Sequence, residues 1–320
     1  MEAFDPMNRL FLTGGTGFVG GRFIDRYHRR FGITALVRGD SLSGKRVRIA
    51  TGDLLDADSL LSATTGCDAV LHIGGATPNR AYAAGSFNAT TVGTRNLIAA
   101  ARAHGIRRFI FVSSLCVLFP GKGPYARSKT EAEEAVMRSD LEWTILRPDT
   151  IVGHGAKDLG RTLRLWKSAR YIPIIGDGAY TSQPIHVDEV CAALASALET
   201  SASVGLAISL AGKDLVPFNE FARRFCRALG NNRRRFVHIP KWFVYPLAGI
   251  ASFVHPQWGL NPERVNIITE PHTVDLSLMR AVLRIEPMPF EEAVRLTVNQ
   301  WLRGKTASSE PPEHRTAILP

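Results

Sequence analysis

The stretch Leu10-Phe11-Leu12-Thr13-Gly14-Gly15-Thr16-Gly17-Phe18-Val19-Gly20 decides the architecture of this chain. Its apolar start is typical of a short buried strand, and the glycines that follow are typical of a tight turn. From Gly17 to Arg30 the apolar residues recur at helical spacing. The stretch therefore predicts a strand, a glycine turn and a helix in immediate succession.

The same alternation continues through the first half of the chain. Further strands are predicted at Ile33–Val37, Val47–Ala50, Ala69–Ile73, Phe109–Ser113 and Trp143–Leu146. Helices are predicted between them, at Asp56–Thr64, Asn88–Ala103 and Ala126–Arg138. Strands that alternate with helices of this length form right-handed βαβ units. We therefore expect an α/β fold with a doubly wound parallel sheet of the Rossmann type.

After Pro148 the rhythm loosens. Predicted helices are separated there by loops that contain glycine and proline; they lie at Asp158–Ser168, Val187–Glu199, Asn219–Leu229 and Phe290–Arg303. We expect residues 1–150 to form the nucleotide-binding domain, with later segments contributing strands. Residues 151–303 should form mainly a smaller C-terminal substrate-binding lobe, and residues 304–320 a flexible tail.

Composition limits the classes of function. The 320 residues are 45% hydrophobic and carry a net charge of +10, which could suggest nucleic acid as a partner. Residues 1–150 contain 19 basic and 14 acidic side chains, and residues 151–320 contain 20 and 15. Since the charge is spread evenly, we expect an Arg-rich surface and no nucleic-acid partner.

Several features favour a cytoplasmic location. The four cysteines are far apart, so neither a disulfide framework nor a metal site is expected. Residues Met1–Asn8 have no apolar core and do not resemble a secretory signal. The longest apolar run, Trp242–Val254, is too short for a transmembrane segment and is expected to form a buried or interfacial helix.

The glycine turn indicates a dinucleotide site. Gly14 would make the turn, Gly17 would admit a diphosphate against bare backbone, and Gly20 would let helix and strand pack closely. The helix N terminus would offer N–H groups and positive dipole to the phosphates. The cofactor-binding residues expected here are Gly14, Thr16, Gly17, Phe18, Val19 and Gly20.

The next strand ends point to the adenosine half. Arg38 stands where an acidic residue would accept hydrogen bonds from the ribose of NAD. A guanidinium suits a 2′-phosphate, so NADP(H) is favoured over NAD(H), although Asp40 leaves NAD open. Asp53, with Leu54 beside it, would accept from the adenine amino group or cap the following helix. Small residues at the end of the fourth strand, Gly74, Gly75 and Ala76, permit close approach of a ligand.

Tyr125 and Lys129 form the catalytic candidate. Residues i and i+4 are neighbours on a helix, so the Lys129 ammonium would lower the pKa of the Tyr125 phenol toward the working pH. Ser114, at the carboxyl end of the fifth strand, could donate a hydrogen bond to a substrate carbonyl. The alternative interpretation is an exposed Tyr–Lys pair and a strand-end serine that caps backbone.

In its motifs the chain resembles the extended short-chain dehydrogenase/reductases, the NAD-dependent epimerase/dehydratase family. The resemblance covers roughly Arg9 to Arg303, and the motifs occur in the family's order. They are Thr13–Gly20, Asp53-Leu54, Gly93-Thr94 with Asn96-Leu97, Val112-Ser113-Ser114, Tyr125-x-x-x-Lys129, Leu146-Arg147-Pro148 and Pro184–Asp188.

The resemblance implies roles for individual residues. It implies that Tyr125 is the acid/base, Lys129 its pKa modifier and ribose anchor, and Ser114 the group that polarises the carbonyl. It also implies that the stretch Pro148–Ile151 borders the nicotinamide. Pro148 and Ile151 are therefore expected among the cofactor-binding residues. His186 resembles the family's structural histidine at a helix start.

Some positions depart from the family's pattern. Thr90 stands where the family often has an Asn that relays protons. The loop Gly176–Pro184 lacks the Arg with which many nucleotide-sugar members grip the diphosphate. Arg161, Arg164 and Lys167, spaced i, i+3 and i+6, could bind phosphates instead or form a solvated basic face.

The predicted reaction is hydride transfer between a nicotinamide cofactor and a secondary alcohol or ketone, either net or transient. A nucleotide sugar is the first substrate hypothesis. A hydrophobic ketone or steroid-like alcohol is the alternative, supported by the missing Arg and the apolar Trp242–Val254 segment. A third hypothesis is a sensor or structural subunit that binds dinucleotide without turnover. A homodimer is expected only from analogy with the family.

Overall fold

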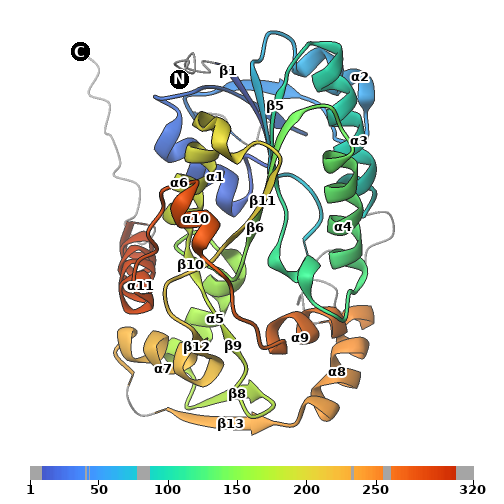
Figure 1. Ribbon diagram of the computed structural model, residues 1–320. Helices are drawn as coiled ribbons and strands as arrows, with labels where there is room; N and C mark the ends of the chain where they lie inside the picture. Colours follow the sequence, from blue (N-terminus) through green and yellow to red (C-terminus); the bar gives the residue numbers. More distant parts are fainter. Residues whose placement is uncertain are drawn as a thin grey trace, which may run out of the picture.

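A seven-stranded parallel sheet forms the centre of the molecule (Figure 1). The computed structural model describes residues 9–39, 42, 44–77, 87–231, 234–254 and 261–307. The strand order is β11-β6-β5-β4-β1-β2-β3. The strands are β1 (Arg9–Thr13), β2 (Gly32–Val37), β3 (Arg48–Thr51), β4 (Ala69–His72), β5 (Arg108–Val112), β6 (Glu142–Pro148) and β11 (Leu206–Leu210). The chain leaves β1 in one direction along the sheet and returns to β4 on its other side. In sheets with this topology, ligands bind in the crevice between the carboxyl ends of these two strands.

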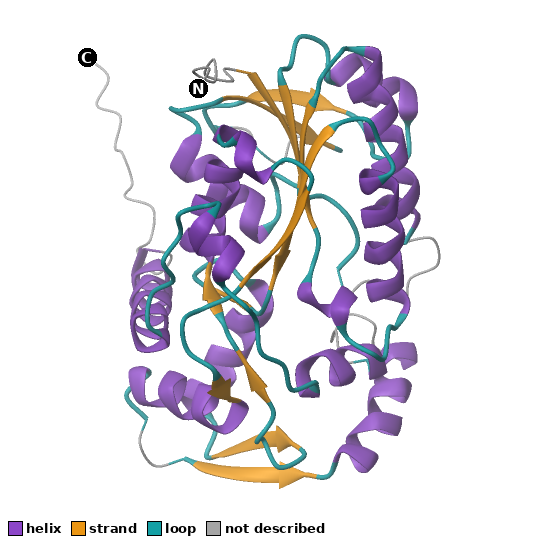
Figure 2. Ribbon diagram, in the orientation of Figure 1, coloured by secondary structure: helices purple, strands orange, loops and turns teal. Residues whose placement is uncertain are grey.

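Helices cover both faces of the sheet (Figure 2). One face carries α2 (Ala57–Ala63), α3 (Asn88–Ala103) and α4 (Pro124–Met137); the other carries α1 (Phe18–Tyr27), α6 (Val187–Glu199) and α10 (Ser277–Ala281). Successive residues of β1 enter opposite cores, Phe11 on the α3–α4 side and Leu12 on the α1–α6 side. A strand buried on both faces needs a continuous apolar run, which explains the sequence of β1.

The C-terminal lobe has a core of its own, around Trp166, Phe221, Phe225 and Phe290. Its helices are α5 (Lys157–Ser168), α7 (Phe218–Ala228), α8 (Lys241–Val254), α9 (Pro262–Thr269) and α11 (Phe290–Ala307). Its strands form three two-stranded sheets: β7 (Ile151–Val152) with β10 (Ile185–His186), β9 (Thr181–Ser182) with β12 (Val216–Pro217), and β8 (Tyr171–Ile175) with β13 (Arg235–Ile239). Short 3-10 turns lie at Leu115–Leu118 and Ser201–Ser203.

The expected doubly wound α/β architecture is confirmed, and each predicted strand of the first half lies in the sheet within a few residues. The second half supplies the seventh strand, β11. It also supplies α6 (Val187–Glu199), which packs against α1 although its sequence lies in the range expected to form mainly the lobe. Helix α4 begins at Pro124 because proline is favoured in the first turn.

The C-terminal helix runs further than the sequence suggests. Helix α11 continues to Ala307, beyond the expected start of a tail at residue 304. The remaining tail residues, 308–320, lie outside the described part of the chain, as do Met1–Asn8 and Asp40. In the ranges that the structure describes, no helix combines the length and apolar character needed to cross a membrane.

Candidate active site

The glycine turn after β1 lies against the end of β4. Gly14 has a φ of +78°, and a Cβ at this position would lie 2.7 Å from the backbone nitrogen of Gly74. A Cβ on Gly20 would lie 2.2 Å from the carbonyl oxygen of Gly14. Both positions therefore require glycine, one for its backbone conformation and both for the close approach of chain segments. Among the described residues, no side chain caps the N terminus of α1 at Gly17.

This bare turn fits a diphosphate, because side chains are missing where a ligand must approach and backbone N–H groups face outward from α1. Phe18, in the first turn of α1, contacts the segment after β7: a Cβ on Gly153 would lie 3.2 Å from the tip of its ring. Through Phe18, the helix that follows the glycine turn therefore contacts Gly153, two residues after the Pro148–Ile151 stretch. The expected diphosphate and nicotinamide regions thus lie side by side.

The adenosine-site candidates meet at the ends of β2 and β3. The Arg38 guanidinium lies 3.9 Å from the Asp53 carboxylate and is 77% exposed. The other Asp53 oxygen accepts the N–H of Leu55 at 2.9 Å, so the carboxylate shapes the turn that holds Leu54. Asn96 of α3 donates to the Leu54 carbonyl at 3.1 Å. Arg38 is therefore accessible to a ligand. The alternative role of Asp53, as the cap of the following helix, is not observed, because the Asp56 carboxylate caps α2 by accepting the N–H groups of Asp58 and Ser59.

A chain of buried hydrogen bonds lies beneath the crevice. The His72 Nδ1 lies 2.7 Å from the Thr13 hydroxyl, and its Nε2 lies 3.0 Å from the Thr94 hydroxyl. Thr94 in turn donates to the Thr90 carbonyl at 2.5 Å. Because the Thr94 hydroxyl donates its proton to Thr90, it accepts a hydrogen bond from the His72 Nε2, which therefore carries the ring proton. The Nδ1 atom then carries no proton and accepts from the Thr13 hydroxyl, so His72 is neutral. Burial, with the charge of Lys129 next in importance, lowers the pKa of His72 to about 3.

Thr90 also holds the end of β4. Its hydroxyl accepts the N–H of Ala76 at 2.9 Å. A Cβ on Gly75, whose φ is +146°, would lie 3.0 Å from that hydroxyl and 3.7 Å from the Lys129 nitrogen. The stretch Gly74–Ala76 therefore lies between the glycine turn and the candidate catalytic helix.

Ser114, Tyr125 and Lys129 converge at the end of β5. The Ser114 hydroxyl lies close enough to the Tyr125 phenol to lower the pKa of that phenol, against the larger effect of burial. The Lys129 ammonium donates to the Val112 carbonyl at 2.9 Å and lies 4.7 Å from the centre of the Phe111 ring. The structure thus brings together the three residues that the sequence singled out, and it buries Tyr125 and Lys129. The exposed Tyr–Lys pair of the alternative interpretation is not observed.

The electrostatics of this group differ from the expectation. Burial raises the pKa of Tyr125, and the neighbouring Cys116 and Glu263 raise it further, against the opposing effect of the Ser114 hydroxyl. Burial also lowers the pKa of Lys129 to about 8. The predicted lowering of the Tyr125 pKa by Lys129 is therefore wrong: burial dominates, and Lys129 is not among the groups that shift this pKa. Tyr125 carries its proton at neutral pH.

Glu263 reaches the catalytic helix from the C-terminal lobe. Its carboxylate accepts the N–H groups of Tyr125 and Ala126, both at 3.1 Å, and it is 4% exposed. A carboxylate is favoured at a helix N terminus, where two unpaired N–H groups and the positive dipole end lie. A Cβ on Gly123 would overlap the Glu263 carboxyl group, which explains the glycine there. Helix α9 is thereby fixed to α4.

An ion pair fixes the C-terminal half of the catalytic helix. Arg147 of β6 donates to both carboxylate oxygens of Glu133, at 2.9 and 2.6 Å. Glu133 lies four residues after Lys129 on the same face of α4. The Leu146-Arg147-Pro148 motif therefore holds α4 against the sheet.

Asp149 and His272 form a buried pair where Pro148–Ile151 begins. The Asp149 carboxylate accepts the N–H of Gln183 at 2.7 Å and lies 3.0 Å from the His272 Nε2. The His272 Nδ1 lies 2.8 Å from the Glu270 carbonyl, so both ring nitrogens face acceptors. Burial alone would lower the pKa of His272, but the bond to Asp149 and its charge raise it. Both nitrogens of His272 therefore carry protons at mildly acidic pH.

His186 has the structural role that the resemblance implied. Its ring accepts the N–H of Asp188 at 3.3 Å and caps α6. Asp188 then pairs with Arg22 of α1 at 2.6 Å. The Pro184–Asp188 motif therefore ties α6 to α1 and supplies no group to the catalytic cluster.

Sequence reasoning missed Glu263, His272 and Cys116 as neighbours of the site, and it assigned no role of its own to Asp149 within the expected Pro148–Ile151 stretch. Asp149 follows the Leu-Arg-Pro motif directly, and that position was the available signal. Glu263 and His272 come from the lobe, and no spacing in the sequence connects them to Tyr125. Arg161, a candidate phosphate ligand on α5, lies 3.9 Å from Asp158, while Arg164 and Lys167 are exposed.

Comparison with known proteins gives a consistent relationship. A family model described as NAD(P)H-binding matches residues 14–165. A 2-alkyl-3-oxoalkanoate reductase of Stenotrophomonas maltophilia is 30% identical over 70% of this chain and 77% of its own length. A 3beta-hydroxysteroid-dehydrogenase/decarboxylase, isoform 2, of Arabidopsis thaliana is 26% identical over 88% of this chain. That match spans 57% of the plant protein, so the chain corresponds to little more than half of it.

A solved structure extends the comparison to the fold. The dTDP-glucose 4,6-dehydratase of Streptomyces venezuelae, solved with NAD bound, superposes with a TM-score of 0.73. The match covers 94% of this chain and 98% of that one at 20% sequence identity. At this identity the similarity concerns the fold, which includes both the sheet and the C-terminal lobe.

Proposed function

Because this chain belongs to the extended short-chain dehydrogenase/reductases, a family of NAD(P)-dependent enzymes, we propose that it reduces the ketone of an apolar substrate, with NADPH as the preferred reductant. The observation that carries the proposal is the meeting of Ser114, Tyr125 and Lys129 beside Gly75, at the edge of the dinucleotide crevice. A sensor without turnover has no need of this buried cluster.

The glycine turn of residues 14–20 would hold the diphosphate, and Arg38 with Asp53 would hold the adenosine end. Gly74–Ala76 and Pro148–Ile151 would border the nicotinamide. The bound cofactor supplies or accepts a hydride at the carbon of the carbonyl group. Lys129 would anchor the nicotinamide ribose through its ammonium.

The protein's own residues would move the proton. In reduction, Tyr125 gives its phenolic proton to the carbonyl oxygen as that oxygen gains negative charge, and Ser114 donates a second hydrogen bond to it. The raised pKa of Tyr125 keeps the phenol protonated at neutral pH, which is the state that reduction needs. Oxidation of the alcohol would require the phenolate and should be favoured at alkaline pH.

The substrate class rests on two observations. The loop Gly176–Pro184 has no arginine to hold a diphosphate, and the two relatives above are named for a steroid and an alkyl-branched 3-oxo acid. Both names describe molecules with an apolar body next to the reacting carbon. A nucleotide sugar remains the second hypothesis, because Arg164 and Lys167 of α5 are exposed and could bind a diphosphate.

A substrate panel separates these hypotheses. We would follow NADPH oxidation with 3-oxosteroids, 2-alkyl-3-oxoalkanoates and small ketones, and test UDP- and dTDP-hexoses for epimerisation and dehydration in parallel. We expect turnover of the apolar ketones, with kcat/KM rising with the length of the apolar chain. Turnover confined to nucleotide sugars would refute the apolar assignment, whereas no turnover by any substrate at saturating NADPH would favour the sensor hypothesis.

Self-association is a separate proposal. By analogy with the family, helices of the nucleotide-binding domain would form a homodimer. The exposed sides of α3 and α4 line a shallow groove that includes Arg95, Arg102, Glu131 and Arg138. Light scattering coupled to gel filtration tests this, and substitutions in this groove should dissociate such a dimer.

A further inference from the structure

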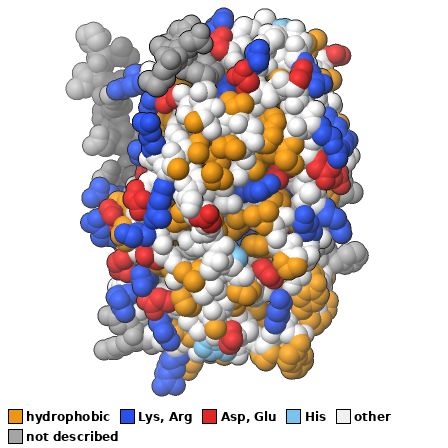
Figure 3. All heavy atoms as spheres, in the orientation of Figure 1, with side chains coloured by type: hydrophobic (Ala, Val, Ile, Leu, Met, Phe, Trp, Pro, Cys, Tyr) orange, Lys and Arg blue, Asp and Glu red, His pale blue; other side chains and the backbone are white. Residues whose placement is uncertain are grey.

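Helix α8 presents its large apolar side chains to solvent. Phe243, Leu247, Ile250 and Val254 are spaced i, i+4, i+7 and i+11 and therefore form one stripe along the helix. They are 50%, 47%, 61% and 59% exposed. This stripe, which we call the α8 stripe, is visible as hydrophobic surface at the lower right of Figure 3.

The opposite face of α8 carries the smaller side chains. Val244, Ala248 and Ala251 share the spacing i, i+4 and i+7, and Ala248 is fully buried. Trp242 and Tyr245, near the start of the helix, are 76% and 41% exposed. A helix stabilised by burial within its own protein would have the reverse arrangement. The large residues of α8 are therefore placed for contact with something outside the described chain.

The sequence around α8 is strongly cationic. From Phe221 to Pro262 it contains seven Lys or Arg residues and neither Asp nor Glu. This stretch supplies seven of the ten net positive charges of the whole chain. The even distribution between the two halves of the sequence conceals this local concentration of charge.

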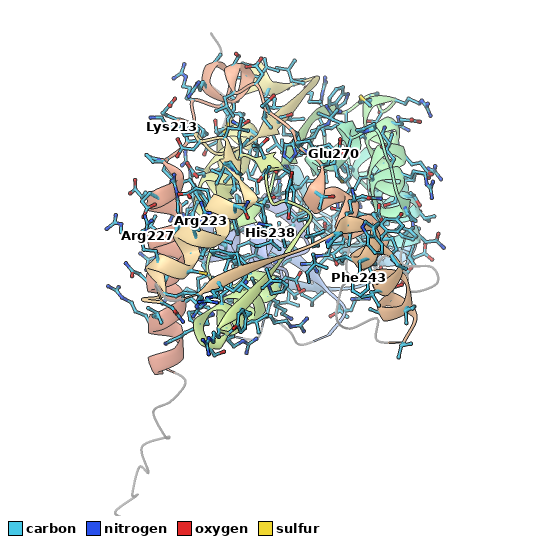
Figure 4. All side chains as sticks on the ribbon, turned by 90° about the horizontal axis from the view of Figure 1, so that it is seen from below. Lys213, Arg223, Arg227, His238, Phe243 and Glu270 are labelled. Atoms are coloured by element: carbon cyan, nitrogen blue, oxygen red, sulfur yellow. The ribbon has the colours of Figure 1, made fainter. Side chains whose placement is uncertain are left out.

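The cations and the stripe occupy one end of the molecule. Figure 4 shows this end, with Arg223 and Arg227 of α7 on one side, Phe243 of α8 on the other and His238 of β13 between them. Arg223, Arg227, Arg235 and Lys241 are exposed. Arg224 pairs with Glu220 at 2.8 Å and is not counted among them. The turn after β8 adds one exposed carboxylate, Asp177.

We propose that this end of the molecule docks on an anionic bilayer surface, with the α8 stripe entering the interface and the cations of α7 and β13 facing lipid headgroups. An exposed apolar helix face, aromatic residues near the start of the helix and cations on the same end of the molecule are the features of an interfacial helix. At 14 residues α8 is about 21 Å long, shorter than the roughly 30 Å of a hydrocarbon core. It would therefore lie along the surface.

The alternative occupants fit less well. A symmetric contact with a second copy would place the same cationic surfaces against each other, which is unfavourable. A nucleic acid would pair with the cations but leave the α8 stripe in water. The bilayer satisfies both features, because anionic headgroups lie directly above an apolar interior.

The α8 stripe lies next to an element of the lobe that contacts the candidate active site. Helix α8 packs on α9, whose Glu263 holds the N terminus of the catalytic helix at Tyr125. A lipid-soluble substrate could therefore reach the site from the bound side of the protein. The docking proposal does not depend on the identity of that substrate.

Flotation of the full chain with vesicles tests the proposal. The wild type should float with phosphatidylcholine vesicles that contain phosphatidylglycerol, bind pure phosphatidylcholine much more weakly, and be released by salt. The variant Phe243→Ser/Ile250→Ser should lose binding to both vesicles. Arg223→Glu/Arg227→Glu should weaken binding to the anionic vesicles by at least roughly tenfold, since each cation near the surface contributes about fivefold.

Matched variants on the opposite end serve as controls. Leu61→Ser on α2 and Arg29→Glu at the end of α1 change equally exposed side chains and should float like the wild type. All variants should keep the wild-type melting temperature and NADPH affinity. Failure of the wild type to bind anionic vesicles would overturn the proposal. So would a dimer in gel filtration that the stripe variant alone dissociates, because that result would assign the stripe to a second copy.

Discussion

His72 illustrates how a single residue sets the properties of the crevice. Its ring joins Thr13 of β1 to Thr94 of α3. In the neutral ring, Nδ1 accepts a hydrogen bond from the Thr13 hydroxyl, and protonation of Nδ1 would remove that acceptor. The pKa of about 3 in the fold lies below the ordinary value of 6.5. The unfolded chain therefore binds one proton more than the folded chain between these two pH values.

The stability of the fold should consequently fall as the pH drops below 6.5. Between pH 6.5 and pH 3, this residue alone should lower the free energy of unfolding by about 1.4 kcal/mol for each pH unit of acidification. Its contribution to stability is complete above pH 6.5. Urea unfolding of the wild type and of His72→Gln at pH 7, 6, 5 and 4 measures it. The variant should start less stable and lose less on acidification; parallel curves would contradict the neutral, buried state of His72.

Arg38 is the residue on which the cofactor preference depends. Its guanidinium is exposed beside Asp53 and could make charge-assisted bonds to a 2′-phosphate. Arg38→Ala should weaken NADPH binding by roughly 10- to 100-fold and change NADH binding little. Fluorescence titration of both cofactors checks this, with Arg29→Ala as the control. An equal loss for both cofactors would mean that Arg38 stacks on the adenine without reading the phosphate.

Among the helices and strands near the site, α1 packs closely against the glycine turn. A Cβ on Gly20 would lie 2.2 Å from the Gly14 carbonyl, whereas a Cβ on Gly21 would lie 3.4 Å from the Gly15 carbonyl, an ordinary contact. Gly20→Ala should therefore destabilise the fold by about 1–3 kcal/mol and weaken NADPH binding.

Gly21→Ala provides the matched control for this substitution. Alanine is favoured over glycine within a helix by about 1 kcal/mol, so this variant should be as stable as the wild type or slightly more stable. Urea unfolding and NADPH titration of both variants give the comparison. Equal effects of the two substitutions would contradict the packing described here.

The link between α9 and α4 gives a prediction about pH. The Glu263 carboxylate raises the pKa of Tyr125, so Glu263→Gln should lower that pKa. In reduction, the alkaline fall of kcat/KM should then begin at lower pH than in the wild type. The substitution should also cost about 1–3 kcal/mol of stability, because one backbone N–H of α4 loses its acceptor.

The pH–rate profile distinguishes this role from simple stabilisation. Glu291→Gln, at an exposed carboxylate of α11, should leave both the profile and the stability unchanged. A Glu263→Gln enzyme that is less stable but keeps the wild-type profile would show that Glu263 acts only as a helix cap.

Elements with a strong local signal could be predicted from the sequence. The strands near Phe11 and Phe111 are buried on both faces and so have continuous apolar runs. Gly14 has a backbone conformation that favours glycine, and Gly20 packs so closely that a larger side chain does not fit. Helix α6 was harder to place, because an amphipathic helix shows that it has an inner face but not which core that face enters. Packing between elements distant in sequence decides that question.

At the scale of the whole molecule, the candidate site combines both halves of the chain. The first half provides Ser114, Tyr125 and Lys129, and their convergence followed from strand-end positions and helical spacing. The lobe provides Glu263 and His272, which contact this group only because α9 and the loop after it return to the sheet. The expected lowering of the Tyr125 pKa failed for the same reason, since spacing predicts neighbours but not the degree of burial.

Tyr125 is proposed to transfer the proton in a hydride-transfer reaction. The most direct measurement is single-turnover oxidation of bound NADPH by the best ketone of the panel, for the wild type and Tyr125→Phe, with NADPH affinity measured on the same samples. Proton transfer by a positioned group contributes roughly 10²- to 10⁴-fold, so the variant should be slower by that factor while it binds NADPH within about twofold of the wild type. Tyr245→Phe, at an exposed tyrosine of α8, should react like the wild type. An unchanged rate in Tyr125→Phe would show that Tyr125 does not transfer the proton.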